Sequence, residues 1–256
     1  MKLTTVLAGI GLFLLVVFPM HLNGATSSKP QVVMIFEDSK GYTFSQADRE
    51  AITQISREAV NDIASILPGL PDKVEIVVSV EEPEAVIPGL GYGAIALSPV
   101  RVGWFVDPAF GAGVEETARN GLRRALFHEV HHIVRGWTLE EGSAGTRMID
   151  AAVAEGLATV FERRSAPAVN DLPWGQYDPE TAPALVEEIR KIPDQDEYGI
   201  WMFEHPDGRI FIGYRAGTFV VDEAIRKTGS SAADLAKTPT DEILAMAGLA
   251  RDGAER

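Results

Sequence analysis

The chain has 256 residues, of which 46% are hydrophobic and 23% are charged, with 23 Lys and Arg against 37 Asp and Glu and no Cys. These proportions are those of a globular protein, and they exclude a disordered, collagen-like or coiled-coil chain. The formal net charge of −14 argues against nucleic acid as a partner, because phosphate binding requires a basic surface. The lack of cysteine excludes thiol nucleophiles, disulfides and Cys-ligated zinc, so any metal must be held by His and carboxylate side chains.

The N-terminal segment has the pattern of a secretory signal peptide. A positively charged start is followed by an unbroken apolar run from Val6 to Phe18 and then by small residues. Such a run rises ~20 Å as a helix, which is short of the ~30 Å hydrocarbon core of a bilayer. We therefore expect residues 1–25 to be removed after export to the periplasm or the cell exterior, residues 26–30 to be a linker, and residues 31–256 to form one domain. The alternative is an uncleaved segment that anchors the chain in the membrane.

The first half of the mature chain is predicted to supply the strands and one helix. Short apolar or alternating runs bounded by Gly and Pro are typical of buried strands, and they occur at residues 31–36, 73–80, 94–97 and 100–106. Ser45 has the residue type of an N-cap, and the apolar spacing after it predicts a helix that ends at the Pro68-Gly69 pair. The run from Val100 to Val106 is either an edge strand along which an extended peptide pairs or an ordinary sheet strand.

The second half is predicted to be mostly helical. Apolar residues at helical spacing, closed by Gly or Pro, predict helices at about residues 115–135, 146–164, 180–191 and 214–227, and a last one from residue 238. The segment His205–Gly208 is typical of a hairpin turn. Because strands come first and helices later, the predicted fold class is α+β, in a single domain.

The predicted helix at 115–135 contains a His-Glu-x-x-His pattern, made by His128, Glu129 and His132. Residues four apart on a helix project from one face, ~6 Å apart at their Cβ atoms, so both imidazoles can bind one tetrahedral zinc ion. Glu129 lies ~100° round the helix, where its carboxylate can take a proton from the attacking water as a general base. The surrounding residues are apolar, and burying these polar groups among them is costly unless they are paired or bound to a metal.

A catalytic zinc usually has three protein ligands and one open position. Glu155 is the best candidate for the third ligand, because it is a lone carboxylate in a strip of Ala and Gly on the predicted helix at 146–164. Small residues allow two helices to approach closely, and the glycine-rich loop at 142–145 is expected to turn the chain back so that Glu155 faces the histidine pair. The alternative for Glu155 is an exposed helix carboxylate.

These residues also carry a resemblance to known families. His128, Glu129 and His132, followed 23 residues later by Glu155 in the run EGLA, resemble the gluzincins, zinc metallopeptidases whose third ligand is a helix Glu. More closely, the runs HEVHHIVR, IDAAVAEGLATVFE and GYRAGTFVV resemble a predicted Zn-dependent protease family filed as a domain of unknown function. The resemblance covers roughly residues 100–225. It implies a zincin-like fold, a zinc-dependent hydrolase, His128, His132 and Glu155 as zinc ligands, and Glu129 as the base.

Four other residues are candidates for supporting roles. Tyr214 is either the donor that stabilises the oxyanion of a tetrahedral intermediate or a core aromatic residue. His131 is expected to pack in the core or to support a ligand histidine rather than to bind the metal. Asp150 is a candidate to orient a ligand imidazole, although it lies ~140° from Glu155 on the same helix. His205, beside a proline in a turn, is expected to be an exposed loop histidine.

The predicted function is that of an exported zinc-dependent peptidase, which hydrolyses a peptide or related amide bond in a peptide or protein substrate. The alternative is a non-catalytic envelope protein whose histidines bind a partner or hold a structural metal, and a structural site would have four protein ligands. A hydrolase of a non-peptide amide would use the same zinc chemistry. Contact with a membrane is expected only if the N-terminal segment stays uncleaved, and the sequence predicts no particular oligomeric state.

Overall fold

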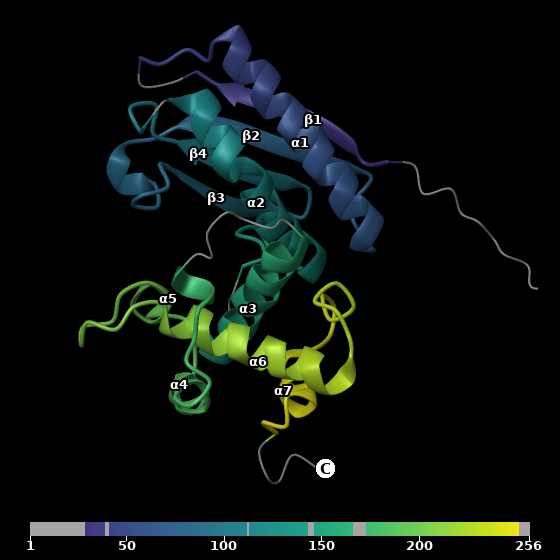
Figure 1. Ribbon diagram of the computed structural model, residues 1–256, viewed down its shortest axis with the longest axis vertical. Helices are drawn as coiled ribbons and strands as arrows, with labels where there is room; N and C mark the ends of the chain where they lie inside the picture. Colours follow the sequence, from purple (N-terminus) through teal and green to yellow (C-terminus); the bar gives the residue numbers. More distant parts are fainter. Residues whose placement is uncertain (1–28, 39–40, 112, 143–145, 166–172, 251–256) are drawn as a thin grey trace, which may run out of the picture.

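The computed structural model describes residues 29–38, 41–111, 113–142, 146–165 and 173–250 (Figure 1). The predicted signal peptide at 1–25 lies outside these ranges, as does most of the predicted linker at 26–30. In the part of the chain that is described, none of the helices combines the length and the apolar character needed to cross a membrane.

A four-stranded mixed sheet forms the first half of the domain. Its strands are β1 (Gln31–Glu37), β2 (Lys73–Val80), β3 (Tyr92–Ser98) and β4 (Arg101–Val106), in the spatial order β1-β2-β4-β3. β1, β2 and β4 are parallel, whereas β3 runs antiparallel to β4 and forms one edge. Buried and partly exposed positions alternate along β2, as expected for a sheet that packs one face against the core.

Helix α1 (Gln46–Ile66) crosses from β1 to β2, which is the connection that two parallel strands require. Its start is fixed by a capping box: the Ser45 side chain accepts from the Asp48 backbone N–H, and the Asp48 carboxylate accepts from the Ser45 backbone N–H. α1 packs beside α2 (Val114–Arg135), and the two helices lie together against the sheet (Figure 1).

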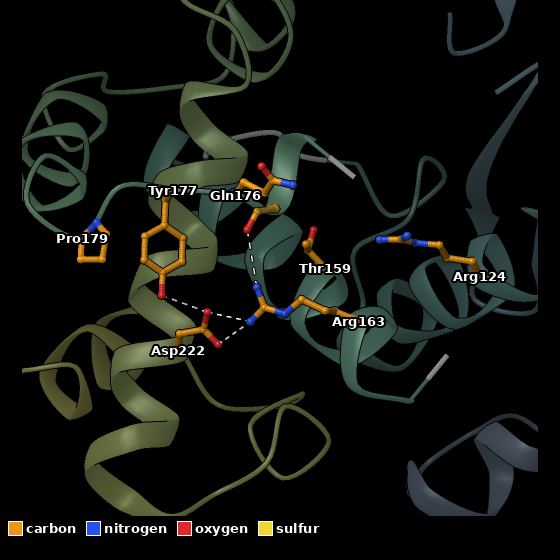
Figure 2. A pocket seen from close by; sticks show the side chains of 8 residues that line it. Arg124, Thr159, Arg163, Gln176, Tyr177, Pro179 and Asp222 are labelled. Atoms are coloured by element: carbon orange, nitrogen blue, oxygen red, sulfur yellow. Dashed lines mark hydrogen bonds and ion pairs between the residues drawn. The ribbon is translucent and has the colours of Figure 1, made fainter. Parts of the chain in front are cut away.

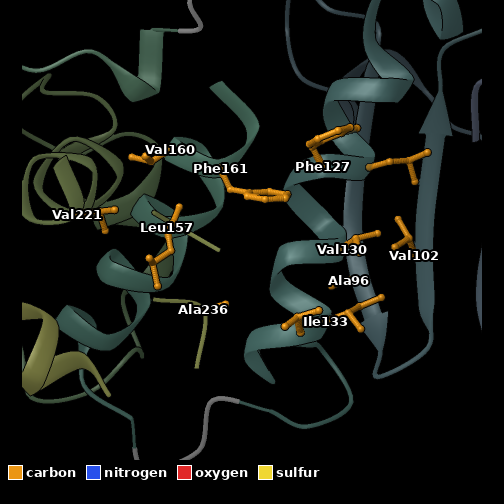
Figure 3. Packing of buried hydrophobic residues seen from close by; sticks show 14 of the residues in the cluster. Ala96, Val102, Phe127, Val130, Ile133, Leu157, Val160, Phe161, Val221 and Ala236 are labelled. Carbon is orange, nitrogen blue, oxygen red and sulfur yellow. The ribbon is translucent and has the colours of Figure 1, made fainter. Parts of the chain in front are cut away.

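Helix α2 lies between the sheet and the helical second half, so it is buried along most of its length. Figure 3 shows it between Val102 of the sheet and Phe161 of α3 (Met148–Ser165). The rings of Phe127 and Phe161 stack with centroids 5.6 Å apart and join the two helices. α2 ends at Gly136, whose φ of 80° is the left-handed conformation that glycine adopts without a Cβ clash.

The second half is a group of helices around α3. It contains α4 (Ala182–Ile189), α5 (Tyr198–Met202), α6 (Ile212–Thr228) and α7 (Thr240–Met246). The described residues also include two 3₁₀ turns, η1 (Pro83–Ala85) and η2 (Pro173–Gly175). α3 and α6 are in backbone contact, because a Cβ on Gly217 would lie 1.7 Å from the carbonyl oxygen of Ala152 and one on Gly156 would lie 2.2 Å from the carbonyl carbon of Gly217. The small residues near Glu155 therefore allow close packing of α3 against α6.

The α+β class and the order of strands and helices are confirmed. One element was missed, and one open alternative is decided. The five-residue helix α5 was not predicted, because it is too short to show a helical repeat. Residues 100–106 form an ordinary sheet strand and not an edge strand, because β4 lies between β2 and β3. The edge strands are β1 and β3, and the carbonyls of Ala96 and Leu97 in β3 accept from the N–H groups of residues 139 and 140.

Candidate metal centre

Two histidines of α2 face the same side of the helix. His128 and His132 are one turn apart, and their ring centroids are separated by 4.8 Å. Both side chains are buried, with 9% and 4% of the residue surface exposed. Their Nε2 atoms point toward α3, at the place where the sequence analysis expected a third ligand.

Glu155 of α3 meets both imidazoles. Its Oε2 atom lies 3.1 Å from Nε2 of His128 and 3.3 Å from Nε2 of His132. The ligand atoms of the three residues all lie within 4.8 Å of one another. A tetrahedral zinc ion with bonds of ~2.0–2.1 Å holds neighbouring ligand atoms ~3.3 Å apart, so the two spacings between Glu155 and the histidines match those of such an ion. The structure thus brings the three predicted ligands together, and α2 and α3 run in opposite directions where they meet.

The remaining oxygen of Glu155 has its own partner. The Tyr198 hydroxyl donates a hydrogen bond of 2.9 Å to Oε1, so Oε2 is the oxygen that faces the histidines. Burial alone would raise the pKa of Glu155, but the charges of His132 and His128 and their hydrogen bonds hold it well below its ordinary value. Burial, and then the charge of Glu155, raise the pKa of Tyr198 well above 10, so its hydroxyl keeps the donated proton. Tyr198 lies on the unpredicted helix α5, and no spacing in the sequence connected it to the histidines.

Glu129 lies beside this cluster without being part of it. The side chain is 8% exposed, and burial raises the pKa of its carboxyl against the opposing charges of His128 and His132. A backbone hydrogen bond from Ala96 of β3 holds the carboxylate toward the edge of the sheet. Glu129 is therefore a buried carboxyl next to the two histidines, which is the position that a general base at this site requires.

Tyr214, at the start of α6, belongs to the same cluster of polar groups. Its pKa is raised well above 10, by burial first and then by the charge of Glu155, and hydrogen bonding to Glu155 adds to the effect. Its ring also contacts Phe203 and Phe211. His205, by contrast, lies on a hairpin outside the cluster, where its Nδ1 is 2.9 Å from Asp207. It is partly buried rather than exposed as expected, because its ring packs on Trp201 with centroids 4.7 Å apart.

His131 points away from the cluster. It is fully buried, its Nε2 lies 3.3 Å from the carbonyl oxygen of Ala232, and its ring packs on Phe161. Burial lowers the pKa of His131 to about 3, so the ring is neutral. Asp150 is also remote in its contacts, since its carboxylate binds Arg147 at 2.8 Å near the start of α3. Asp150 thus does not orient either histidine.

The carboxylate that contacts Nδ1 of a histidine of the pair is Glu162. Its Oε2 lies 2.9 Å from Nδ1 of His128, and its Oε1 pairs with Arg124. Sequence reasoning missed this residue, although a signal was present: Glu162 is two helical turns after Glu155 on the same face of α3. Arg124, in turn, is one turn before His128 on α2.

The domain is α+β, and two buried histidines converge with Glu155 beside the buried carboxyl of Glu129. This arrangement is that of a protein able to hold a divalent metal ion. The sequence model of the family described as "Predicted Zn-dependent protease (DUF2268)" matches residues 111–245, which include α2, α3 and α6. The chain belongs to this family, and the closer of the two resemblances drawn from its sequence, to a predicted Zn-dependent protease family, is confirmed. The curated proteins and the solved structures gave no match.

Proposed function

We propose that the protein is a zinc-dependent peptidase of the gluzincin type, which hydrolyses a peptide or related amide bond. The observation that carries this proposal is the convergence of Oε2 of Glu155 with Nε2 of His128 and His132, at 3.1 and 3.3 Å, beside the buried carboxyl of Glu129. The family description supports a zinc-dependent protease as well.

The donor set suits zinc. Two imidazole nitrogens and one carboxylate oxygen are ligands that zinc accepts in catalytic sites, and three protein ligands leave a fourth position open. His131 is directed toward Ala232, which argues against a closed site with four protein ligands from this segment. Zinc bound at this site would polarise the scissile carbonyl and make water a stronger nucleophile near neutral pH.

The remaining steps are assigned to groups of the chain. Glu129 would take the proton of the attacking water and deliver it to the leaving amine, because its carboxyl lies beside the ligand histidines without occupying a ligand position. Tyr214 would donate its hydroxyl proton in a hydrogen bond to the oxyanion, since its raised pKa keeps it protonated. Tyr198, bonded to Glu155, would hold that ligand in place.

We propose export for the same protein, on the evidence of its sequence. The apolar run that ends at Phe18 is too short for an ordinary membrane span and follows a positive start, which supports a cleaved signal peptide. A peptidase in the periplasm or outside the cell would act on peptide or protein substrates in an oxidising compartment, where a chain without cysteine has no thiol to protect.

The test is a measurement of zinc content and peptide hydrolysis in the purified protein. We expect about one zinc per chain, release of peptide fragments from a denatured protein substrate, and loss of both in His132→Ala. His205→Ala is the matched control, because His205 pairs with Asp207 and packs on Trp201 outside the cluster, and should leave both unchanged. A wild-type protein that binds no zinc, or a His132→Ala variant that still binds one, would overturn the proposal.

A further inference from the structure

We propose that Glu162 and Arg124 form a positioning pair that orients His128 and thereby sets the affinity of the site for zinc. The inference rests on the proposed function to the extent that His128, His132 and Glu155 bind zinc. It goes beyond that function because it makes the zinc affinity depend on two residues that are not themselves proposed ligands.

The first support is the direction of the two ring nitrogens of His128. Nε2 faces Glu155 at 3.1 Å, and Nδ1, on the other side of the ring, lies 2.9 Å from Oε2 of Glu162. A carboxylate only accepts hydrogen bonds, so Nδ1 donates to Glu162, and Nε2 is left to the Glu155 side, where its lone pair would face a bound metal ion. This is the tautomer that a metal ion at the Glu155 side requires.

The second support is the way in which Glu162 is itself held. The residue is 2% exposed, and a buried carboxylate needs an opposite charge and hydrogen bonds to offset its loss of hydration. Arg124, 9% exposed, pairs through its Nε with Oε1 of Glu162 and leaves Oε2 to His128. The arginine therefore fixes the position of the carboxylate, and the carboxylate fixes the ring.

The third support is an arrangement in which the two helices contribute residues in turn. Arg124, His128 and His132 are spaced by four along α2, and Glu155 and Glu162 are spaced by seven along α3. The contacts run from His132 to Glu155, to His128, to Glu162 and to Arg124. Among the described residues, Nδ1 of His132 has no hydrogen-bond partner, so this support acts on His128 alone.

A neighbouring ion pair provides a matched control. Arg124 lines a polar pocket of about 440 Å³, and a second Arg–carboxylate pair, Arg163–Asp222, lies in the wall of the same pocket (Figure 2). Arg163 binds both oxygens of Asp222 at 2.7 Å, and the Tyr177 hydroxyl donates to Oδ2 at 3.1 Å. No ligand residue of the metal centre lines this pocket as described, so neutralising Asp222 removes a similar pair without changing a histidine contact.

The experiment is a competition titration of zinc against a chelating dye, with the full chain stripped of metal beforehand. We expect Glu162→Gln to raise the zinc Kd by about 10–100-fold, the usual effect of losing the group behind a ligand histidine. Asp222→Asn should change the Kd by less than about twofold. The absorption bands of the Co²⁺-loaded protein should shift in Glu162→Gln and stay unchanged in Asp222→Asn.

Equal zinc affinity in wild type and Glu162→Gln would overturn the inference while leaving the proposed peptidase intact. An equal loss in both variants would also overturn it, because the effect would then come from general destabilisation. Wild type that binds no zinc would overturn the proposed function and this inference together. If Glu162→Gln fails to fold, long-range ¹⁵N–¹H NMR of the wild-type zinc form decides: we expect His128 to carry its proton on Nδ1, and a proton on Nε2 would contradict the proposal.

Discussion

The Tyr198 hydroxyl lies 2.9 Å from Oε1 of Glu155, and the other oxygen of that carboxylate faces the two histidines. A carboxylate can present either oxygen, or both, to a metal ion. The hydrogen bond from α5 occupies Oε1 and leaves Oε2 to the histidines, so a helix of five residues helps to fix the orientation of a side chain on α3.

Removing the Tyr198 hydroxyl tests this orientation. Tyr198→Phe should lower the free energy of unfolding by about 1.5–3 kcal/mol, the range for a hydrogen bond to a charged group, and should also weaken zinc binding. Denaturant unfolding and zinc titration measure the two effects. The control is Tyr177→Phe, which loses a hydroxyl bond to Asp222 and should affect stability alone. Unchanged zinc affinity in Tyr198→Phe would show that Oε1 does not need this partner.

The role of Glu129 separates metal binding from turnover. Glu129→Gln should retain about one zinc per chain and lose peptidase activity by at least ~10²-fold, because the amide cannot accept the proton of the attacking water. Glu116→Gln, an exposed position on the same helix, should keep both properties. Zinc content by elemental analysis and turnover of a peptide substrate provide the comparison. Wild-type turnover in Glu129→Gln would exclude Glu129 as the base.

His131 distinguishes an open site from a closed one. His131→Gln should keep about one zinc per chain, since the ring of His131 is directed toward Ala232 and Phe161. The free energy of unfolding should fall by about 1–3 kcal/mol, because His131 is buried and hydrogen-bonded. Metal analysis of the folded variant and its unfolding curve measure these effects. Loss of zinc from a folded His131→Gln protein would instead favour a structural metal with His131 as a fourth ligand.

The contact between α3 and α6 should tolerate no side chain. In Gly217→Ala the new Cβ would meet the carbonyl oxygen of Ala152 at 1.7 Å, so we expect a loss of about 3 kcal/mol or more in the free energy of unfolding. Gly199→Ala is the control: it lies in helix α5, its Cβ would meet nothing within 4 Å, and its stability should be unchanged or slightly raised. Equal unfolding midpoints for the two variants would contradict the close packing.

The elements and the cluster of His128, His132 and Glu155 could be predicted because their signals are local. The spacing of His128 and His132 places both on one face of any helix, and the apolar residues around them predict that the helix is buried. Glu155 stood out because nothing else in its small-residue strip is charged. Each of these inferences depends on a few neighbouring residues, and the fold then brought the three side chains together as expected.

The supporting residues could not be predicted in the same way. Tyr198 reaches Glu155 from a separate short helix, and its contact depends on how α5 and α3 pack rather than on a repeat. Asp150 was the candidate to hydrogen-bond a ring nitrogen of a histidine, but Asp150 binds Arg147, and it is Glu162 that contacts Nδ1 of His128. The periodicity of α3 was sufficient to put Glu162 on the face of Glu155, but which carboxylate meets His128 depends on the register between two helices, and that register is a tertiary property.

Helix α3 has different partners on adjacent residues: Glu155 faces the histidines of α2, and Gly156 touches the backbone of α6. Because successive helix residues point ~100° apart, a rotation of α3 that relieved crowding at Gly156 would carry the Glu155 carboxylate away from both imidazoles. A metal ion bound at the proposed site would therefore be sensitive to the rotation of α3, and we expect damage on the far side of the helix to weaken zinc binding before the domain unfolds.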